Sequence, residues 1–182
     1  MSDLIISWVS PILPRRSLAG IPLGLAEAEL ERGLARYSID EEGLLYQFHE
    51  SPVLKLSRYF DDVEGRSGYV FDLFQSDIIS LNKAGTPALS VTLKDGNVFA
   101  IKVYDFSFPG ESASFFVYKG LLPSGVGLGG KISELLPFTV LEFDRGNEWF
   151  ITDEGFGLVE VSGWGVPLDE RLDQIVTAIC IL

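Results

Sequence analysis

The chain has 182 residues, which is the size of one domain or of two small halves that share a core. With 47% hydrophobic and 22% charged residues, its composition is that of a globular protein and excludes wholesale disorder. A net charge of −12 argues against a non-specific nucleic-acid-binding protein and against docking on an anionic membrane. We therefore expect neither a nucleic acid nor a membrane as a partner.

The chain contains one histidine, His49, and one cysteine, Cys180. These counts exclude a disulfide within the chain and a zinc site built from cysteine and histidine. We expect His49 to end a strand and Cys180 to be a buried small hydrophobic residue. A general base at His49 and a nucleophile at Cys180 are the less favoured alternatives. We predict no catalytic residue, no metal and no cofactor, and the sequence does not indicate an enzyme.

The first element is an apolar run at residues 4–9, which follows Asp3. An export signal would have a positively charged start and a longer apolar run, so we interpret this segment as a first β-strand. No stretch reaches the ~18 consecutive apolar residues of a membrane-spanning helix. The expected location is therefore the cytoplasm.

A long amphipathic helix is predicted at residues 26–37, AEAELERGLARY. The apolar residues Ala26, Leu30 and Leu34 recur every fourth position, which places them on one face of a helix. Glutamates in its first turns and arginines in its later turns suit the helix dipole.

Most of the remaining chain predicts antiparallel strands, because short β-branched and aromatic runs alternate with turn residues. The expected strands are 43–49, 53–60, 69–74, 89–94, 97–108, 114–118, 139–143, 148–152, 157–161 and 172–182. A short helix is expected at 131–136, where Pro137 ends it. The predicted fold class is thus α+β, mainly antiparallel sheet with one long N-terminal helix and one short helix.

Two hairpin turns are marked by glycine. Asp95-Gly96 favours a tight two-residue turn, because both residues tolerate a positive φ. Arg145-Gly146 fits either the same turn or a three-residue loop with Gly146 in the left-handed conformation.

Two segments of the chain resemble each other: residues 20–30 read GIPLGLAEAEL, and residues 125–135 read GVGLGGKISEL. Each leads into one of the predicted helices. If the match reflects a duplication, the chain consists of two similar lobes, at 1–108 and 120–182, each a helix packed on an antiparallel sheet. The alternative is one continuous domain, 1–182, with a single curved sheet.

Acidic residues concentrate at the predicted turns, and aromatic residues flank several of them. Turns that meet at one edge of a sheet give it a negative potential that attracts a basic partner. The simpler explanation is that turns are solvated and solvated residues are charged. The residues that we predict to bind a partner are Asp61, Asp62, Glu64, Asp144, Glu148, Trp149, Asp153, Glu154 and Phe156.

The glycine-framed segments GIPLG and GVGLG, each followed by a helix and by hairpins with acidic turns, resemble small immunity proteins. Such proteins are encoded beside toxins of type VI secretion, Rhs and contact-dependent inhibition systems. The resemblance implies a cytoplasmic antitoxin, not an enzyme, that binds a cognate protein toxin with a basic active-site cleft and occludes that cleft. Two other functions stay open: a structural or adaptor module that assembles through sheet edges, and a hydrolase that uses two carboxylates.

Overall fold

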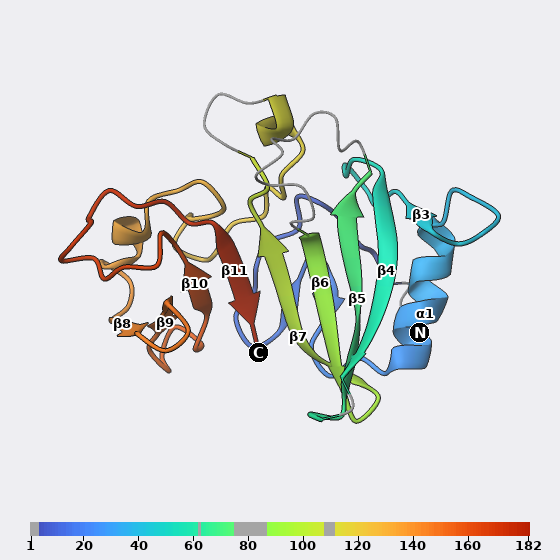
Figure 1. The fold of residues 1–182 in the computed structure, drawn as a ribbon, viewed down its shortest axis with the longest axis horizontal. Helices are drawn as coiled ribbons and strands as arrows, with labels where there is room; N and C mark the ends of the chain where they lie inside the picture. The colour runs from blue at the N-terminus through green and yellow to red at the C-terminus, as the bar shows by residue number, and fades with distance from the viewer. Residues whose placement is uncertain (1–3, 62, 75–86, 108–111) are drawn as a thin grey trace.

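One antiparallel sheet dominates the protein. The computed structural model describes residues 4–61, 63–74, 87–107 and 112–182. In this part of the chain, nine strands form a sheet in the order β3-β4-β5-β6-β7-β11-β10-β9-β8, and β1 and β2 pair separately (Figure 1). The strands are β1 Ser17–Leu18, β2 Ile21–Pro22, β3 Leu45–Tyr46, β4 Leu54–Asp61, β5 Arg66–Leu73, β6 Pro87–Lys94, β7 Asn97–Tyr104, β8 Leu141–Asp144, β9 Trp149–Thr152, β10 Glu160–Ser162 and β11 Ala178–Ile181.

Strands β4 to β7 follow one another as hairpins, as their alternating sequence predicts. The turn between β6 and β7 confirms the expected tight hairpin, since Asp95 and Gly96 both have a positive φ, of 52° and 72°. The turn between β8 and β9 is different. Asp144 pairs with Trp149 across four turn residues, and Glu148 is the residue with positive φ, of 60°. The expectation of a left-handed Gly146 is therefore wrong.

The N-terminal helix is shorter than predicted. Helix α1 covers Glu27–Leu34, and Ala35–Tyr37 continue it as the 3-10 turn η1. The predicted helix at 131–136 is a single 3-10 turn, η5, at Ile132–Leu135. Both corrections concern short segments with few hydrogen bonds, for which nearby packing decides between the α and the 3-10 geometry.

Residues 4–9 do not form the predicted strand. Their alternating pattern does bury Ile6 and Trp8, which are at most 1% exposed. The segment, however, makes only one isolated bridge, between Ser7 and His49. Its apolar residues therefore reflect burial under the sheet and not membership of it.

The strand predicted at 114–118 is also absent. Its start lies in the 3-10 helix η4 at Ser112–Phe115, and the rest is irregular. The carbonyl of Phe116 accepts a hydrogen bond from Nε1 of Trp8 at 2.8 Å. A contact with the N-terminal segment thus takes the place of the strand pairing expected at 114–118.

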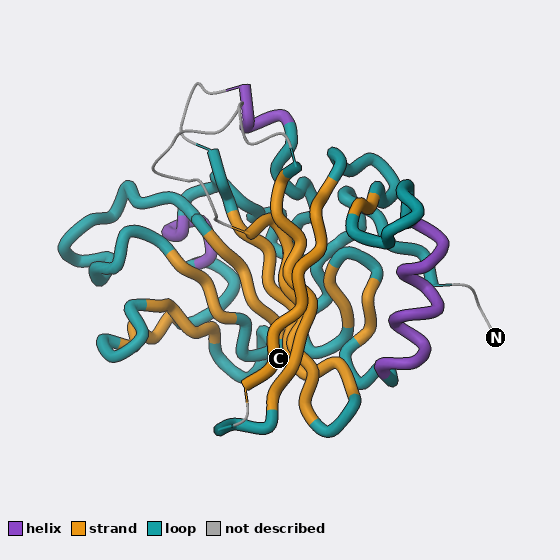
Figure 2. The backbone as a smooth tube through the Cα atoms, turned by 45° about the vertical axis from the view of Figure 1, so that its right-hand side comes forward, coloured by secondary structure: helices purple, strands orange, loops and turns teal. Residues whose placement is uncertain are grey.

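The core lies on one face of the sheet. Trp8, Ile12 and Leu18 of the N-terminal segment belong to the same buried cluster as Ile101 and Val103 of β7. Figure 1 shows this segment, in blue, behind β5–β7, and Figure 2 shows helix α1, in purple, to one side of the strands. We call the opposite face of the sheet, which points away from this core, the outer face.

The two segments that match in sequence adopt the same backbone arrangement. Gly24 and Gly129 occupy equivalent positions and have a φ of 76° and 78°. Their N–H groups donate to the carbonyls of Val98 and Val176 at 2.8 and 2.9 Å. The N–H groups of the same two valines donate to the carbonyls of Leu25 and Gly130, the residues after these glycines, both at 2.8 Å.

From this correspondence and the register of β7 and β11 we infer that the strands about the middle of the sheet are arranged around a local two-fold axis. Val98 and Val176 differ by 78 residues (176 − 98), and so do Lys102 and Cys180 (180 − 102). Lys102 and Cys180 face each other in the antiparallel pair β7–β11, so the axis passes between them. The sheet is continuous across the β7–β11 pair. The division into lobes at 1–108 and 120–182, or a single domain at 1–182, stays a prediction.

Candidate interaction surface

A polar hollow of about 270 Å³ opens on the outer face of the sheet. Pairing across β7, β11, β10 and β9 creates it, since Lys102 lies opposite Cys180, Cys180 opposite Glu160, and Glu160 opposite Ile151. Residues paired in this way project from the same face. The lining residues are Lys102, Asp144, Asn147, Trp149, Ile151 and Glu160.

Lys102 forms one wall of the hollow. Its Nζ lies 3.8 Å from the ring centroid of Trp149 and 5.0 Å from that of Tyr104, which are cation–π distances. Partial burial lowers the pKa of the Lys102 ammonium, and the negative charge of Glu160 acts in the opposite direction. The chain thus already places one cation on the aromatic wall of this hollow.

Cys180 lies beneath this lysine. Burial and the nearby Glu160 raise the pKa of its thiol to about 12, so the thiol is neutral at neutral pH. Cys180 is buried, as the sequence predicts. His49 is exposed, and its ring lies 5.5 Å from that of Tyr37 in an edge-to-face contact.

The predicted partner-binding residues lie in three places. Asp144 and Trp149 line the hollow, and Glu148 is next to Trp149 in the β8–β9 turn. The next group, Asp153, Glu154 and Phe156, lies in the turn at the other end of β9. Asp61 and Glu64 lie at the β4–β5 hairpin, with four strands between it and β9. Asp62 is outside the described residues. The eight described residues therefore do not form one surface.

Several of these acidic side chains stabilise their own turns. Asp153 accepts hydrogen bonds from the N–H groups of Val140 and Phe156, at 2.8 and 2.9 Å, and from the hydroxyl of Thr139 at 2.9 Å. These bonds lower the pKa of Asp153. Hydrogen bonds within the turns therefore explain some of the acidic residues there, without a binding partner.

Asp144 stabilises its own turn and is also available at the surface of the hollow. Its carboxylate accepts hydrogen bonds from the N–H of Gly146 and from Nδ2 of Asn147, both at 2.8 Å, which lower its pKa. The same carboxylate lines the hollow. It is consequently ionised and held in position at neutral pH.

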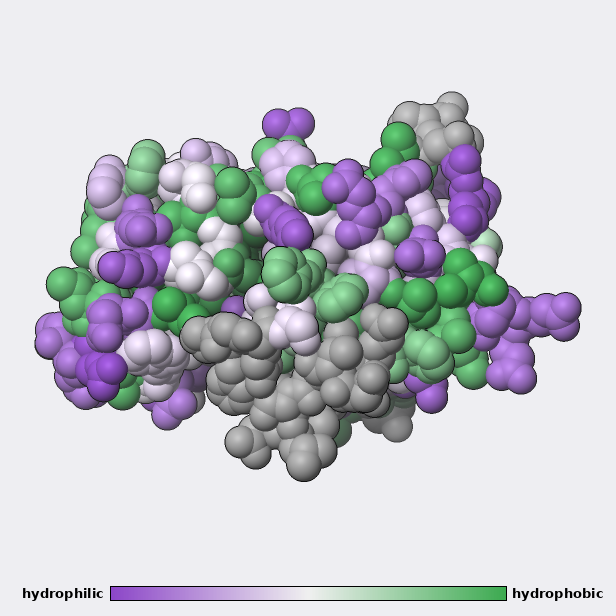
Figure 3. All heavy atoms as spheres, turned by 90° about the horizontal axis from the view of Figure 1, so that it is seen from above, coloured by the Kyte–Doolittle hydropathy of each residue, from purple (hydrophilic) through white to green (hydrophobic). Residues whose placement is uncertain are grey.

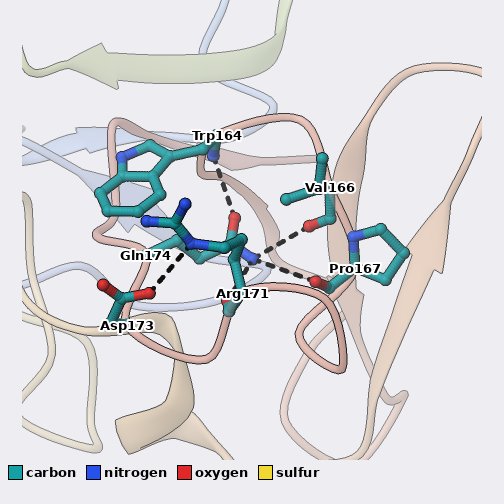
Figure 4. Close-up of polar contacts among 6 residues, drawn as sticks. All are labelled: Trp164, Val166, Pro167, Arg171, Asp173 and Gln174. Carbon is teal, nitrogen blue, oxygen red and sulfur yellow. Dashed lines mark hydrogen bonds and ion pairs between the residues drawn. The ribbon is translucent and has the colours of Figure 1, made fainter.

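The loop at residues 163–174 follows β10, and Figure 4 shows the polar contacts within it. Gln174 is completely buried and organises the loop. Its side-chain oxygen accepts from the N–H of Trp164 at 3.0 Å, and its Nε2 donates to the carbonyls of Val166 and Arg171, both at 2.9 Å. The guanidinium of Arg171 lies over the Trp164 ring at 5.0 Å.

The loop leaves an aromatic side chain at the surface, since Trp164 remains 45% exposed. The loop also reaches the β8–β9 turn, because a Cβ at Gly165 would lie 2.9 Å from Oε2 of Glu148. Glu148 thus connects the hollow with the loop that carries Trp164. Figure 3 shows polar residues, in purple, interspersed with apolar ones, in green, at the end of the molecule where β8 and β9 lie. We call the hollow, Glu148 and Trp164 together the outer surface.

Sequence reasoning missed Lys102, Glu160 and Trp164. Lys102 and Glu160 stand out as charged residues within apolar strands, which is a signal for an outward-facing position. Nothing in the sequence showed that β11 would join their strands. Trp164 lies in a Gly-rich segment whose order depends on the distant Gln174, so no local pattern marked it.

No group of three or more histidine, cysteine, aspartate or glutamate residues within the described chain is placed to hold a metal ion. Among the described residues, no helix has both the length and the apolar character needed to cross a membrane. No protein-family model, curated protein or solved structure matches the chain. The outer surface is therefore the feature of the molecule from which a function can be inferred.

Proposed function

We propose that this chain is an immunity-type protein that binds a cognate bacterial toxin through its outer surface and covers the toxin's basic active site. The observation that carries the proposal is the convergence of Asp144 and Glu160 with Trp149 around one hollow, with Glu148 between that hollow and the loop of Trp164. Aromatic anchors beside charged groups are typical of protein–protein interfaces. The net charge of −12 adds long-range attraction for a basic partner.

The binding mode follows from the properties of this surface. Trp149 and Trp164 offer apolar area on positions fixed by a strand and by the Gln174 network, so little conformational entropy is lost on binding. The carboxylates select for a basic partner and accelerate encounter, an effect that salt weakens. We expect a one-to-one complex whose association slows as salt rises.

A hydrolase is the second candidate, because Asp144 and Glu160 line the same hollow. Two carboxylates beside a cavity can act as acid and base when their environments separate their pKa values. The experiment below separates the two functions, because an inhibitor acts in proportion to the amount of toxin and an enzyme acts catalytically.

The test begins with capture of partners from the source cells by the tagged chain, at low and at moderate salt, followed by mass spectrometry. Each captured basic protein is then expressed alone and with this chain in a test bacterium. We expect one captured protein to stop growth, and its co-expression with the wild-type chain to restore growth at one-to-one stoichiometry.

The matched variants locate the binding face. The double variant Asp144→Asn, Glu160→Gln should weaken the complex ~10-fold or more and reduce protection. The control Glu41→Gln, Glu42→Gln removes the same charge from exposed positions before β3 and should protect normally. Equal protection by both double variants would contradict the proposed face. Growth inhibition by none of the captured proteins would contradict the immunity function.

A further inference from the structure

We propose that the hollow is an arginine-recognition site, into which the basic partner inserts one guanidinium group. This inference rests on the proposed function and adds the chemistry of the contact. It depends on three features of the lining: its charge balance, its aromatic wall and its hydrogen-bond acceptors.

The charge balance of the hollow favours one further cation. Asp144 and Glu160 contribute two carboxylates, whereas Lys102 contributes one ammonium. Glu148, the residue before Trp149, adds another negative charge on the side of the neighbouring loop, where its Oε2 lies next to Gly165. A guanidinium would compensate charge that the chain itself leaves uncompensated.

The aromatic wall already binds a cation. The ammonium of Lys102 sits 3.8 Å from the Trp149 ring centroid, so the ring has a negative face directed into the hollow. Arginine stacks on such rings with its planar guanidinium while its N–H groups stay free for acceptors in the ring plane. Lys102 and the incoming arginine therefore compete for the same ring.

The carboxylate of Asp144 is fixed before binding, and the sheet sets the backbone position of Glu160. Each oxygen of Asp144 accepts one hydrogen bond, from Gly146 or from Asn147, and retains a second lone pair. Glu160 lies across the hollow on β10, held in the ladder between β9 and β11. Acceptors on two sides suit the five-donor fork of a guanidinium better than the single point charge of a lysine.

The test titrates the full-length ¹⁵N-labelled chain with the peptide acetyl-Gly-Arg-Gly-amide and with its lysine and citrulline counterparts. The indole N–H of Trp149 and the side-chain amide of Asn147 report on the hollow, and the indole N–H of the buried Trp8 is the internal control. We expect a dissociation constant in the millimolar range for the arginine peptide, as befits a contact of only a few atoms. The lysine peptide should bind at least ~5-fold more weakly, and the neutral citrulline peptide should leave the spectrum unchanged.

Two variants have opposite expected effects. Glu160→Gln should weaken arginine binding ~5-fold or more, because it removes an acceptor charge. Lys102→Met keeps a long unbranched side chain and removes the competing ammonium, so it should strengthen binding several-fold. Glu41→Gln, at an exposed position away from the hollow, should change nothing. A merely structural role of Lys102 would not produce a gain in affinity.

The outcomes separate this inference from the proposed function. Equal binding of the arginine and lysine peptides, or no shift of the Trp149 signal, overturns arginine recognition. The proposed function still stands in that case if the captured toxin loses affinity for the Asp144→Asn, Glu160→Gln variant. Arginine-selective binding that Glu160→Gln weakens and Lys102→Met strengthens supports the inference, whether or not the captured protein is a toxin.

Discussion

At the scale of single residues, Asp153 shows how an exposed carboxylate is used within the chain. It accepts hydrogen bonds from the N–H groups of Val140 and Phe156 and from the Thr139 hydroxyl. It thereby joins the segment before β8 to the turn after β9. These bonds favour the charged form, and the pKa of Asp153 in the folded state is accordingly lowered.

The lowered pKa gives Asp153 a pH-dependent effect on stability. Because the folded-state pKa lies below the unfolded value of ~3.9, the carboxylate stabilises the fold above that pH and loses its effect as the pH falls through the folded-state pKa. We predict that Asp153→Asn lowers the free energy of unfolding most at neutral pH. The difference from the wild type should shrink below about pH 4. Urea unfolding followed by circular dichroism at several pH values measures this.

Glu154 provides the matched control for Asp153. It is the next residue, it is highly exposed, and its carboxylate makes only a 3.5 Å ion pair with Arg15. Glu154→Gln should leave the pH profile of stability close to that of the wild type, since exposed ion pairs contribute little. If the two variants showed the same profile, the turn hydrogen bonds of Asp153 would not be the cause.

At the scale of elements, the loop at residues 163–174 depends on one buried side chain. Gln174 is completely buried and has hydrogen bonds to four backbone groups of its own loop, those of Trp164, Val166, Pro167 and Arg171. We predict that Gln174→Ala lowers the free energy of unfolding by about 2–4 kcal/mol, because buried backbone groups lose their partners. It should also increase hydrogen exchange in the loop, and thermal unfolding together with exchange mass spectrometry measures both effects.

Gln47→Ala is the control for this prediction. Gln47 is exposed, and its side chain makes one long hydrogen bond, 3.4 Å from Nε2 to the carbonyl of Ser51. Its replacement should change the free energy of unfolding by less than about 0.5 kcal/mol. An equal loss of stability in the two variants would show that the Gln174 network does not organise the loop.

Helix α1 makes contacts with the sheet that its sequence pattern does not predict. The glutamates of its first turns suit the helix dipole, but the structure gives two of them a more specific role. The buried Tyr69 of β5 donates its hydroxyl proton toward Glu27 and Glu31, at oxygen–oxygen distances of 3.1 and 3.0 Å. Burial and the bond to Glu31 raise the pKa of Tyr69. The helix is thus fixed to the sheet by polar contacts that its own periodicity does not reveal.

At the scale of the whole molecule, the two halves are joined at two places. Strand β11 pairs with β7 in the middle of the sheet. On the other side, the N-terminal segment bonds to residues after 108, as Lys119 N–H donates to the Trp8 carbonyl and Ile12 N–H to the Leu121 carbonyl, both at 2.9 Å. The N-terminal segment therefore belongs to the packing of both sequence-defined lobes.

These connections predict that the chain unfolds in one cooperative transition, because neither half keeps its core without the other. The measurement uses two variants that retain only Trp8 or only Trp164, which report on the first and the second half. Within each variant, the fluorescence midpoint in urea should coincide with the far-UV circular dichroism midpoint. Two separated midpoints would instead support independent lobes at 1–108 and 120–182.

The sequence by itself determined the antiparallel hairpins β4 to β7 and the matched glycine segments. These depend on neighbours in the chain: alternation sets which side chains face inward, and Asp95-Gly96 sets the turn. Local patterns also misled, since the alternation of residues 4–9 reflects burial without strand pairing. The tertiary structure alone decided the candidate site. Lys102, Trp149 and Glu160 meet because β11, the last strand, inserts between β7 and β10, and a pairing between such distant segments leaves no trace in local periodicity.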